Sequence, residues 1–573
     1  MNNIIFIFFR PKSDLRLVLV FAGLFWFGAV ALRAIDRYVV EPGTIADGNG
    51  GVYTNWDIAA TQIQWAVDAA TNAGDTVRVS NGVYLLTNQI VVTNAIKLQS
   101  TNGPDGTIVN GGFVFGATGA TTNNRCLYMS NAAAFVSGFT FSNGACTNIG
   151  GAGVWMGRGV LSNCTVCNCT LFQPTNTSGL YFGGGGVVTY GASTVKTCRI
   201  IGNTVTNPPT ILSGNTPGYG GGIYCKDGGY LIVNCLISNN LEYGDVSSGG
   251  YAAGAFLGNG TIQSSLICNN SNRFGGGGAY LDNTIMIGCT VAVNWASDAG
   301  GCYMLRGTIT NCVVSNNTGR GIFAVPNTVS ATAAIKNTAI AGNTREGLYM
   351  YNTKGTNMVS DCIIENNMSN GVTMIQIGRS LYLLNCVVRN NNGGGVKCQN
   401  GTIRNCLIAG NINAGNLGGL LLTTSENGGS TASVSSCTIA SNQSTMAGAG
   451  IRLENTNSTL HISSCIVYSN GVDGTNDLYD KYAPTNYNNI QYSCLGTNPG
   501  FTGMVIIVAD PQFKNFTGGN FRLAGNSPCV NRGSNETWMT NSYDLEKNQR
   551  IRYGTVDMGA YERINEGAIY TIH

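Results

Sequence analysis

A row of aromatic residues is the feature of this sequence best suited to binding chemistry. A glycine, a small or aliphatic residue and an aromatic residue recur in this order along the central part of the chain. The aromatic residues at this position are Tyr224, Phe256, Tyr280, Tyr303, Phe323 and Tyr349. The residues on either side of each ring are apolar or small, so strand alternation predicts that the rings point outward and their neighbours inward. On parallel strands about 4.8 Å apart the six rings would form one outward strip, which suits contact with sugar rings.

A purely structural role for this strip stays open. Aromatic side chains on neighbouring strands stack on one another and stabilise the sheet. Long loops between the strands can also cover them. The exposure of the rings therefore decides whether the strip can meet a ligand.

Few charged residues on the same face could act in catalysis. Lys226 and Asp282 each lie two positions beyond an aromatic residue, and the repeat places them two coils apart, roughly 10 Å. A polysaccharide lyase needs a base, often Lys or Arg, together with a group that neutralises a uronate. A glycoside hydrolase needs two carboxylates at a defined separation. The sequence assembles neither set, so the catalytic residues stay unknown, with Lys226 and Asp282 as candidates.

The unit that would position these side chains recurs through residues 126–470. Its shortest copy, Cys386 to Cys406, contains short alternating runs, the glycine turn Gly393-Gly394-Gly395 and no helical pattern. A unit of about 20 residues made of short strands cannot bury its own apolar face and must stack on its neighbours. The sequence therefore predicts an all-β parallel solenoid.

Two registers mark the repeat, a small residue that is usually cysteine and an asparagine five residues later. The first register holds Cys164, Cys198, Cys235, Ser265, Cys289, Cys312, Thr338, Cys362, Cys386, Cys406, Cys437 and Cys465. The second holds Asn203, Asn240, Asn270, Asn294, Asn317, Asn343, Asn367, Asn391, Asn411, Asn442 and Asn470. We expect the cysteines to be buried apolar side chains and the asparagines to form a hydrogen-bonded ladder at one corner. The glycine runs should mark the other corner, where left-handed angles or close approach are needed.

The two N-terminal segments have different roles. Residues 1–34 have the pattern of an export signal, in which basic residues precede the apolar run Leu17 to Leu32 and cleavage follows Ala31 or Ala34. A membrane anchor is the alternative. Residues 35–125 should form an N-terminal cap and the first coils, with a helix over 58–70 that Asp57 caps. Such a helix would cover the open end of the solenoid.

Both ends of the chain resemble known families. The order YVV…YTNW…AATQIQWAVDAA…GDTVRVSNGVY resembles the start of bacterial right-handed parallel β-helix proteins of the pectin-lyase-like superfamily. In the C-terminal end region, 471–573, the motifs DPQF, SPC and DMGAYE, together with Asp544 and Arg550, resemble the domain called choice-of-anchor Q. Asn531, Lys547 and Gln549 stand where that resemblance leads us to expect an acidic residue, glycine and proline. The resemblance implies a right-handed parallel β-helix with an N-terminal helical cap.

Composition excludes several other functions. Net charge is +3 without a basic run, which gives no support for a nucleic-acid partner. One CxxC, Cys164 to Cys167, and the two histidines His461 and His573 make no metal-ligand cluster, and we expect no cofactor. Cys494 and Cys529 lie outside the repeat and could form one bridge.

These observations favour a secreted or cell-surface protein, expected to be monomeric, without a transmembrane span once the signal is removed. The predicted partner is a polysaccharide or surface glycan, bound through the outward aromatic strip. One alternative is a polysaccharide lyase or glycoside hydrolase acting on an acidic polysaccharide. Another is an adhesin, because the coils also resemble the repeats of polymorphic outer-membrane proteins.

Overall fold

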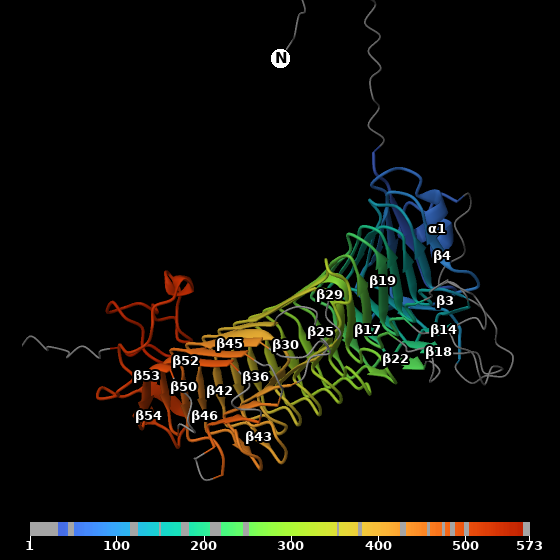
Figure 1. Cartoon of the computed structure of the whole chain (residues 1–573). Helices are drawn as coiled ribbons and strands as arrows, with labels where there is room; N and C mark the ends of the chain where they lie inside the picture. Colours follow the sequence, from blue (N-terminus) through green and yellow to red (C-terminus); the bar gives the residue numbers. More distant parts are fainter. Residues whose placement is uncertain are drawn as a thin grey trace, which may run out of the picture.

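The protein is an elongated, curved stack of parallel β-coils in the computed structural model (Figure 1). The structure describes residues 33–43, 51–114, 124–147, 150–172, 183–206, 219–243, 251–351, 355–375, 381–423, 431–454, 459–472, 476–481, 487–497 and 503–564. Most of the predicted export signal lies outside these residues. Within them, no helix is long and apolar enough to cross a membrane.

Each complete coil contributes a strand to each of three parallel faces, which confirms the predicted right-handed β-helix. The first face includes β19 (Ile223–Asp227), β23 (Ala255–Gly258), β31 (Ile322–Ala324) and β34 (Leu348–Tyr351). The second includes β38 (Leu381–Leu384) and β41 (Gly401–Arg404), and the third β39 (Val387–Arg389), β42 (Leu407–Ala409), β46 (Thr438–Ala440) and β50 (Ile466–Tyr468). β27 (Ala279–Ile287) and β29 (Cys302–Thr310) run from the first face into the second. Parallel pairing continues beyond residue 470, through β52 (Tyr487–Leu495) to β53 (Gly503–Val508).

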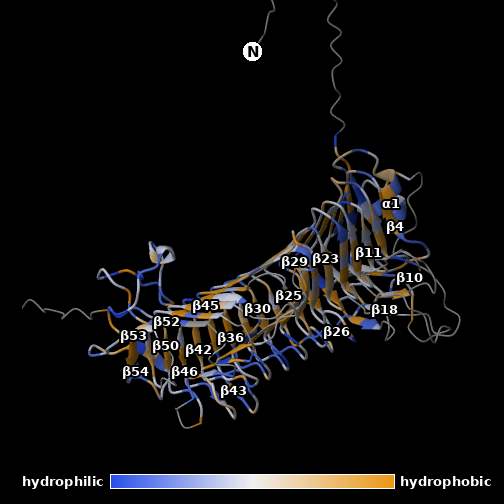
Figure 2. Ribbon diagram, in the orientation of Figure 1, coloured by the Kyte–Doolittle hydropathy of each residue, from blue (hydrophilic) through white to orange (hydrophobic). Residues whose placement is uncertain are grey.

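The cysteine register lies in the core, as predicted. Its cysteines are all buried, and the structure holds them as free thiols. The Cys386 thiol donates to the Leu384 carbonyl at 3.2 Å, and the Val359 carbonyl lies 3.7 Å from the same sulfur. Such thiols fill the interior as small apolar groups. Figure 2 shows hydrophobic residues along the strands of the stack and hydrophilic residues in many of its turns. Cys494 and Cys529 are likewise free, buried thiols, which pack in one cluster.

The asparagine register forms the predicted ladder. The side-chain amide of Asn367 donates to the side-chain oxygen of Asn391 at 2.9 Å, and the backbone N–H of Asn367 donates to the same oxygen at 3.1 Å. This pattern repeats from Asn203 and ends where Asn470 donates to the carboxylate of Asp477. Burial raises the pKa of Asp477 to about 6.

The glycine runs do not form a separate corner, contrary to our prediction. The last glycine of each run lies directly against the asparagine ladder. A Cβ on Gly371 would lie 2.7 Å from the side-chain nitrogen of Asn391, and a Cβ on Gly395 would lie 3.1 Å from that of Asn411. The glycine is needed there for close approach. Left-handed angles fall largely on asparagines just before the registers, such as Asn385 and Asn390, because asparagine tolerates this region.

The N-terminal cap differs from the predicted single helix. A 3-10 turn, η1 (Trp56–Ile58), is followed by extended backbone at Ala59, and α1 begins only at Ile63 (Ile63–Ala69). Asn55, not Asp57, caps η1, because its side-chain oxygen accepts from the N–H groups of Asp57 and Ile58. Helix α1 lies at the N-terminal end of the stack (Figure 1). It buries Ile63 and Val67 against the first coils.

The C-terminal module, which we define as residues 510–564, folds back over the third face. The rings of Phe513, Phe516 and Phe521 pack with Leu407 and Ala440 of that face. Backbone N–H groups of the module donate into the same coils: Gly559 to the Ser464 carbonyl at 2.7 Å and Ala560 to the Thr438 hydroxyl at 3.0 Å. Leu266, Val313 and Ile363, on the same row of earlier coils, are about 40% exposed.

Candidate functional site

The six aromatic residues predicted to form a strip stand in one continuous register on the first face. Direct Cα partners run Tyr224–Phe256–Tyr280–Tyr303–Phe323–Tyr349. Their inward neighbours, such as Leu281 and Met304, are fully buried. The alternation therefore placed these side chains correctly.

The rings stack on one another along the coil axis. Phe256 and Tyr280 are parallel to within 9° at 4.8 Å, and Tyr280 and Tyr303 to within 10° at 5.2 Å. Both faces of the Tyr280 ring are consequently occupied. Phe323 breaks the stack, because its plane is 72° from Tyr303 and 67° from Tyr349.

Two tyrosines outside the predicted row cover its N-terminal half. Tyr219 packs edge-on against Tyr224 and Phe256, and Tyr251 packs edge-on against Tyr280. Tyr224 is 1% exposed and Tyr280 is 4% exposed. Direct contact between a sugar and either ring would therefore require the cover to move. These covering tyrosines each stand five residues before a ring of the row, Tyr219 before Tyr224 and Tyr251 before Phe256, an offset that the predicted pattern did not include.

The C-terminal half of the row is more open. Tyr303, Phe323, Tyr349 and Tyr351 are half-buried. The Arg320 guanidinium lies over the rings of Phe323 and Tyr349, 4.9 and 4.2 Å from their centroids. Ion pairs with Asp298 at 3.4 Å and Glu346 at 3.1 Å hold the guanidinium in place. The open half thus presents ring edges and hydroxyl groups beside a fixed cation.

An ion pair flanks the aromatic row at its centre. Asp282 lies two residues beyond Tyr280 on the same strand, and its carboxylate accepts from the Nε of Arg306 at 2.6 Å. A shift in register between β27 and β29 brings these two residues opposite each other. Both side chains retain partial exposure, 28% for Asp282 and 46% for Arg306. The pair supplies both a hydrogen-bond acceptor and donors next to the row.

The two catalytic candidates stay apart in the structure. Gly258 pairs directly with Asp282, and Lys226 lies one strand further away, so the Lys226 and Asp282 backbones are about 10 Å apart. Lys226 is exposed on the same face. Nothing in this geometry assembles the two into one reacting centre.

Burial raises the pKa of phenols in the row that are protonated at neutral pH in any case. Desolvation raises the pKa of Tyr303 to about 12, and it raises the pKa of Tyr280 and Tyr349. At neutral pH these hydroxyls are therefore hydrogen-bond donors as well as acceptors. Among the described residues no group of three or more His, Cys, Asp or Glu could hold a metal ion.

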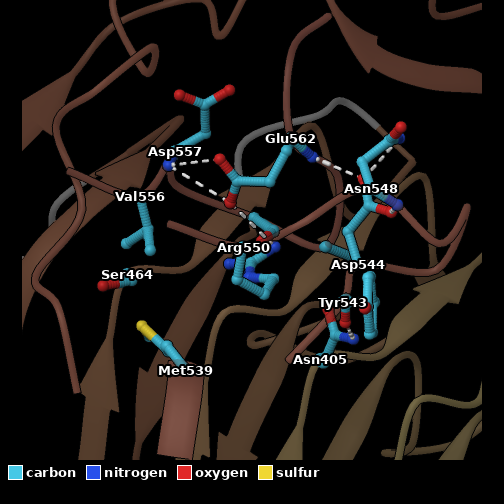
Figure 3. A network of polar contacts seen from close by, with 12 residues as sticks. Asn405, Ser464, Met539, Tyr543, Asp544, Asn548, Arg550, Val556, Asp557 and Glu562 are labelled. Carbon is cyan, nitrogen blue, oxygen red and sulfur yellow. Dashed lines mark hydrogen bonds and ion pairs between the residues drawn. The ribbon is translucent and has the colours of Figure 1, made fainter. Parts of the chain in front are cut away.

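A second polar cluster lies in the C-terminal module (Figure 3). The guanidinium of the fully buried Arg550 lies 3.2 Å from the Glu562 carboxyl group, which also accepts from the Asp557 backbone N–H. Asp544 accepts from the backbone N–H groups of Glu546, Asn548 and Glu562. Burial raises the pKa of Glu562 to about 8. The cluster folds the module on itself, and its residues include the motif noted in the sequence.

Comparison with known structures returns proteins of low similarity. Pectate lyase Pel9A matches at 12% identity, 93% coverage of this chain, 98% of its own and a TM-score of 0.29. The A-module of Azotobacter vinelandii mannuronan C-5 epimerase AlgE6 matches at 13% identity, 78% and 95% coverage and a TM-score of 0.30. Dettilon tailspike protein (gp208) matches at 14% identity, 83% and 69% coverage and a TM-score of 0.28. TM-scores this low support no inference about the site.

The coils of this chain match a known family of repeats. The search of curated proteins finds no match. The family model for a right handed beta helix region matches residues 185–388 and 327–493. These two matches overlap and together span more than half of the chain, including the asparagine ladder from Asn203 to Asn470. The chain therefore belongs to the right-handed β-helix family.

Proposed function

We propose that this protein binds a polysaccharide along the open half of the aromatic row, from the Asp282–Arg306 pair to Tyr349. The observation that carries the proposal is the repeat of the row itself. Successive coils present Tyr303, Phe323 and Tyr349 about 4.8 Å apart in one row. A ligand that repeats along its own length meets an equivalent side chain at each coil, and a glycan chain is such a ligand.

The expected contacts are hydroxyl groups and ring edges rather than ring faces. Neighbouring rings occupy the faces of Tyr280, and Arg320 lies over Phe323 and Tyr349. The protonated Tyr303 hydroxyl and the Asp282–Arg306 pair can exchange hydrogen bonds with sugar hydroxyls. Stacking in the covered half would then stiffen the face that the ligand meets.

The test is binding to a panel of neutral and acidic polysaccharides by affinity electrophoresis. Tyr303→Ala combined with Tyr349→Ala should abolish retardation by the polysaccharide that binds. Tyr382→Ala is the matched control, because Tyr382 is 42% exposed on the second face, away from the row. Retardation that survives the double substitution unchanged would refute the proposal.

An enzymatic function on acidic polysaccharide remains the second candidate, favoured by the exposed Lys226 on the same face as Asp282. It predicts new unsaturated or reducing ends in the same panel and their loss in Lys226→Ala. Binding without such products in the wild-type chain would exclude it for the polysaccharides tested.

The export signal and the choice-of-anchor Q resemblance lead us to place this function outside the cell, in a secreted or surface-held protein. Support for the choice-of-anchor Q resemblance comes from the buried contact between Arg550 and Glu562, because Glu562 is the last residue of the DMGAYE motif. Fractionation of the expressing cells tests the location. Recovery of the chain from the cytoplasm with residues 1–34 intact would contradict it.

A further inference from the structure

A pocket of about 400 Å³ lies where the C-terminal module meets the corner between the second and third faces. The solenoid contributes Asp361 and Arg404, and the module contributes Trp538, Tyr543 and Lys547. This corner is separated from the aromatic row by the second and third faces of the coil. No part of the function proposed above uses it.

Arg404 lines this pocket without an ionic partner among the residues that the structure describes. Its guanidinium lies over the Trp538 ring, 4.7 Å from the centroid. Its Nε is buried without a hydrogen bond, and the guanidinium makes no ion pair with any residue that the structure describes. Leaving such a cation half-buried and unpaired costs stability. An anion that pairs with the rest of the guanidinium would offset that cost.

Lys547 adds a second positive charge at the edge of the pocket. Its backbone is left-handed, with φ +67°, a conformation that favours glycine. Its side chain is 74% exposed, and its ammonium group lies 3.5 Å from the Asp361 carboxylate. A strained backbone at a charged residue points to a role for the side chain that outweighs the strain.

The walls of the pocket are fixed before any ligand arrives. Asn405 donates from its side-chain amide to the backbone carbonyl of Tyr543 at 2.8 Å and to the Asn385 side chain at 2.8 Å, which ties the module to the solenoid. Asp544 also lines the pocket, but its two carboxylate oxygens already accept from backbone N–H groups. The charged groups that remain to face a ligand are therefore the cations of Arg404 and Lys547 and the carboxylate of Asp361.

We propose that this pocket binds the carboxylate of a uronate residue in an acidic glycan. A guanidinium matches a carboxylate with two parallel hydrogen bonds, and Lys547 reinforces the charge. Tyr543, 54% exposed, supplies an aromatic edge for the sugar ring. The inference extends the proposed function, because it states that the glycan is acidic and that it has a second contact outside the aromatic row.

Calorimetric titration of the full chain at low salt tests the proposal with four probes: galacturonate, oligogalacturonate, galactose and acetate. We expect galacturonate and its oligomer to bind. Galactose and acetate should bind at least about tenfold more weakly. Equal binding of galactose would refute the carboxylate contact. Equal binding of acetate would refute a contribution of the sugar ring to binding.

The variants locate the site. Arg404→Gln should weaken galacturonate binding about ten- to a hundredfold. Lys547→Gly should weaken it while raising the melting temperature, because the left-handed backbone is relieved. Arg199→Gln, which removes an exposed charge from the third face in an earlier coil, should change neither. If Arg404→Gln fails to fold, Lys547→Gln gives the same readout at an exposed side chain. Unchanged affinity in the folded variants would overturn the proposal.

The two binding proposals fail separately. The Tyr303→Ala, Tyr349→Ala double variant should keep its affinity for monomeric galacturonate, because the pocket is intact. If that variant loses polysaccharide retardation while Arg404→Gln binds galacturonate normally, only the pocket assignment falls. If Arg404→Gln loses galacturonate binding while the double variant keeps polysaccharide retardation, only the proposal for the aromatic row falls.

Discussion

Asn391 and Asn411 are joined twice across neighbouring coils. The side-chain amide of Asn391 donates to the side-chain oxygen of Asn411 at 2.9 Å, and the backbone N–H of Asn391 donates to the same oxygen at 3.1 Å. Both residues are fully buried. One asparagine per coil thus satisfies a backbone donor and a side-chain donor of the coil before it, in a place that water does not reach.

Asn391→Ala should destabilise the protein by about 2–4 kcal/mol, because the two donors of Asn367 would remain buried without an acceptor. Urea unfolding followed by circular dichroism measures the change. Asn392→Ala is the control, since the adjacent Asn392 side chain is exposed. Equal stability of the two variants would show that the ladder contributes little.

Gly371→Ala should cost about 3 kcal/mol, because the new Cβ would lie 2.6 Å from Val388 and 2.7 Å from the Asn391 amide. Gly228→Ala adds the same methyl group where the nearest atom is 3.5 Å away, and its backbone is not left-handed. Only the first substitution should lower the melting temperature in calorimetry. A comparable loss in both would point to backbone entropy rather than to the close approach.

Tyr251→Ala should uncover Tyr280. Burial raises the pKa of the Tyr280 hydroxyl, and Tyr251 packs against that ring at 4.9 Å. Because the substitution also removes the Tyr251 phenol, the readout in spectrophotometric titration is the number of tyrosines that stay protonated well above pH 10, which should fall. Tyr382→Ala, which removes an exposed ring, should leave the ionisation of Tyr280 unchanged. If the polysaccharide competes with the cover, Tyr251→Ala should also bind it more tightly.

The C-terminal module should lose stability as pH rises. The pKa of Glu562 is raised from 4.5 to about 8 by burial, so the folded chain holds a proton that the unfolded chain releases. The stabilisation is complete below about pH 4.5 and is lost as pH rises through about 8. Melting temperatures measured between about pH 5 and about pH 9 should therefore fall in the wild type. The fall should be smaller in Glu562→Gln, which carries no titrating proton there.

Glu546→Gln is the control for this pH profile, because it removes a carboxylate from an exposed neighbouring position. It should keep the wild-type slope. A Glu562→Gln profile as steep as the wild type would assign the pH dependence to the other buried carboxyls with raised pKa values, Asp477 and Asp557.

The periodic parts of the fold were predictable because each coil must bury the same kinds of side chain at the same positions. An inward cysteine such as Cys386, a ladder asparagine such as Asn391 and an outward ring such as Tyr303 keep their offsets from one coil to the next. The error over the glycine corner came from reading two neighbouring segments as distant ones. Two residues that lie close around one turn give the same sequence signal as two that lie on opposite sides of the coil.

The non-periodic parts were not predictable from the pattern. Tyr219 and Tyr251 share one offset, five residues before Tyr224 and Phe256, but the same position holds glycine, aspartate or threonine in the next four coils, so the pattern was too short to reveal a cover. The contact between Asn405 and Tyr543 joins residues 138 positions apart. The pocket around Arg404 depends on that contact, and neither local propensity nor a repeat contains information about it.

Because the C-terminal module packs over the third face, the two ends of the stack should resist a pulling force differently. Residues 510–564 touch coils from Val387 to Ile466, so these coils cannot separate one by one until the module has been pulled away. In the earlier coils, where Leu266 and Val313 stay uncovered, each coil is held only by its two neighbours. A chain stretched from its termini should therefore yield in many small steps from the N-terminal side and in one large step at the other.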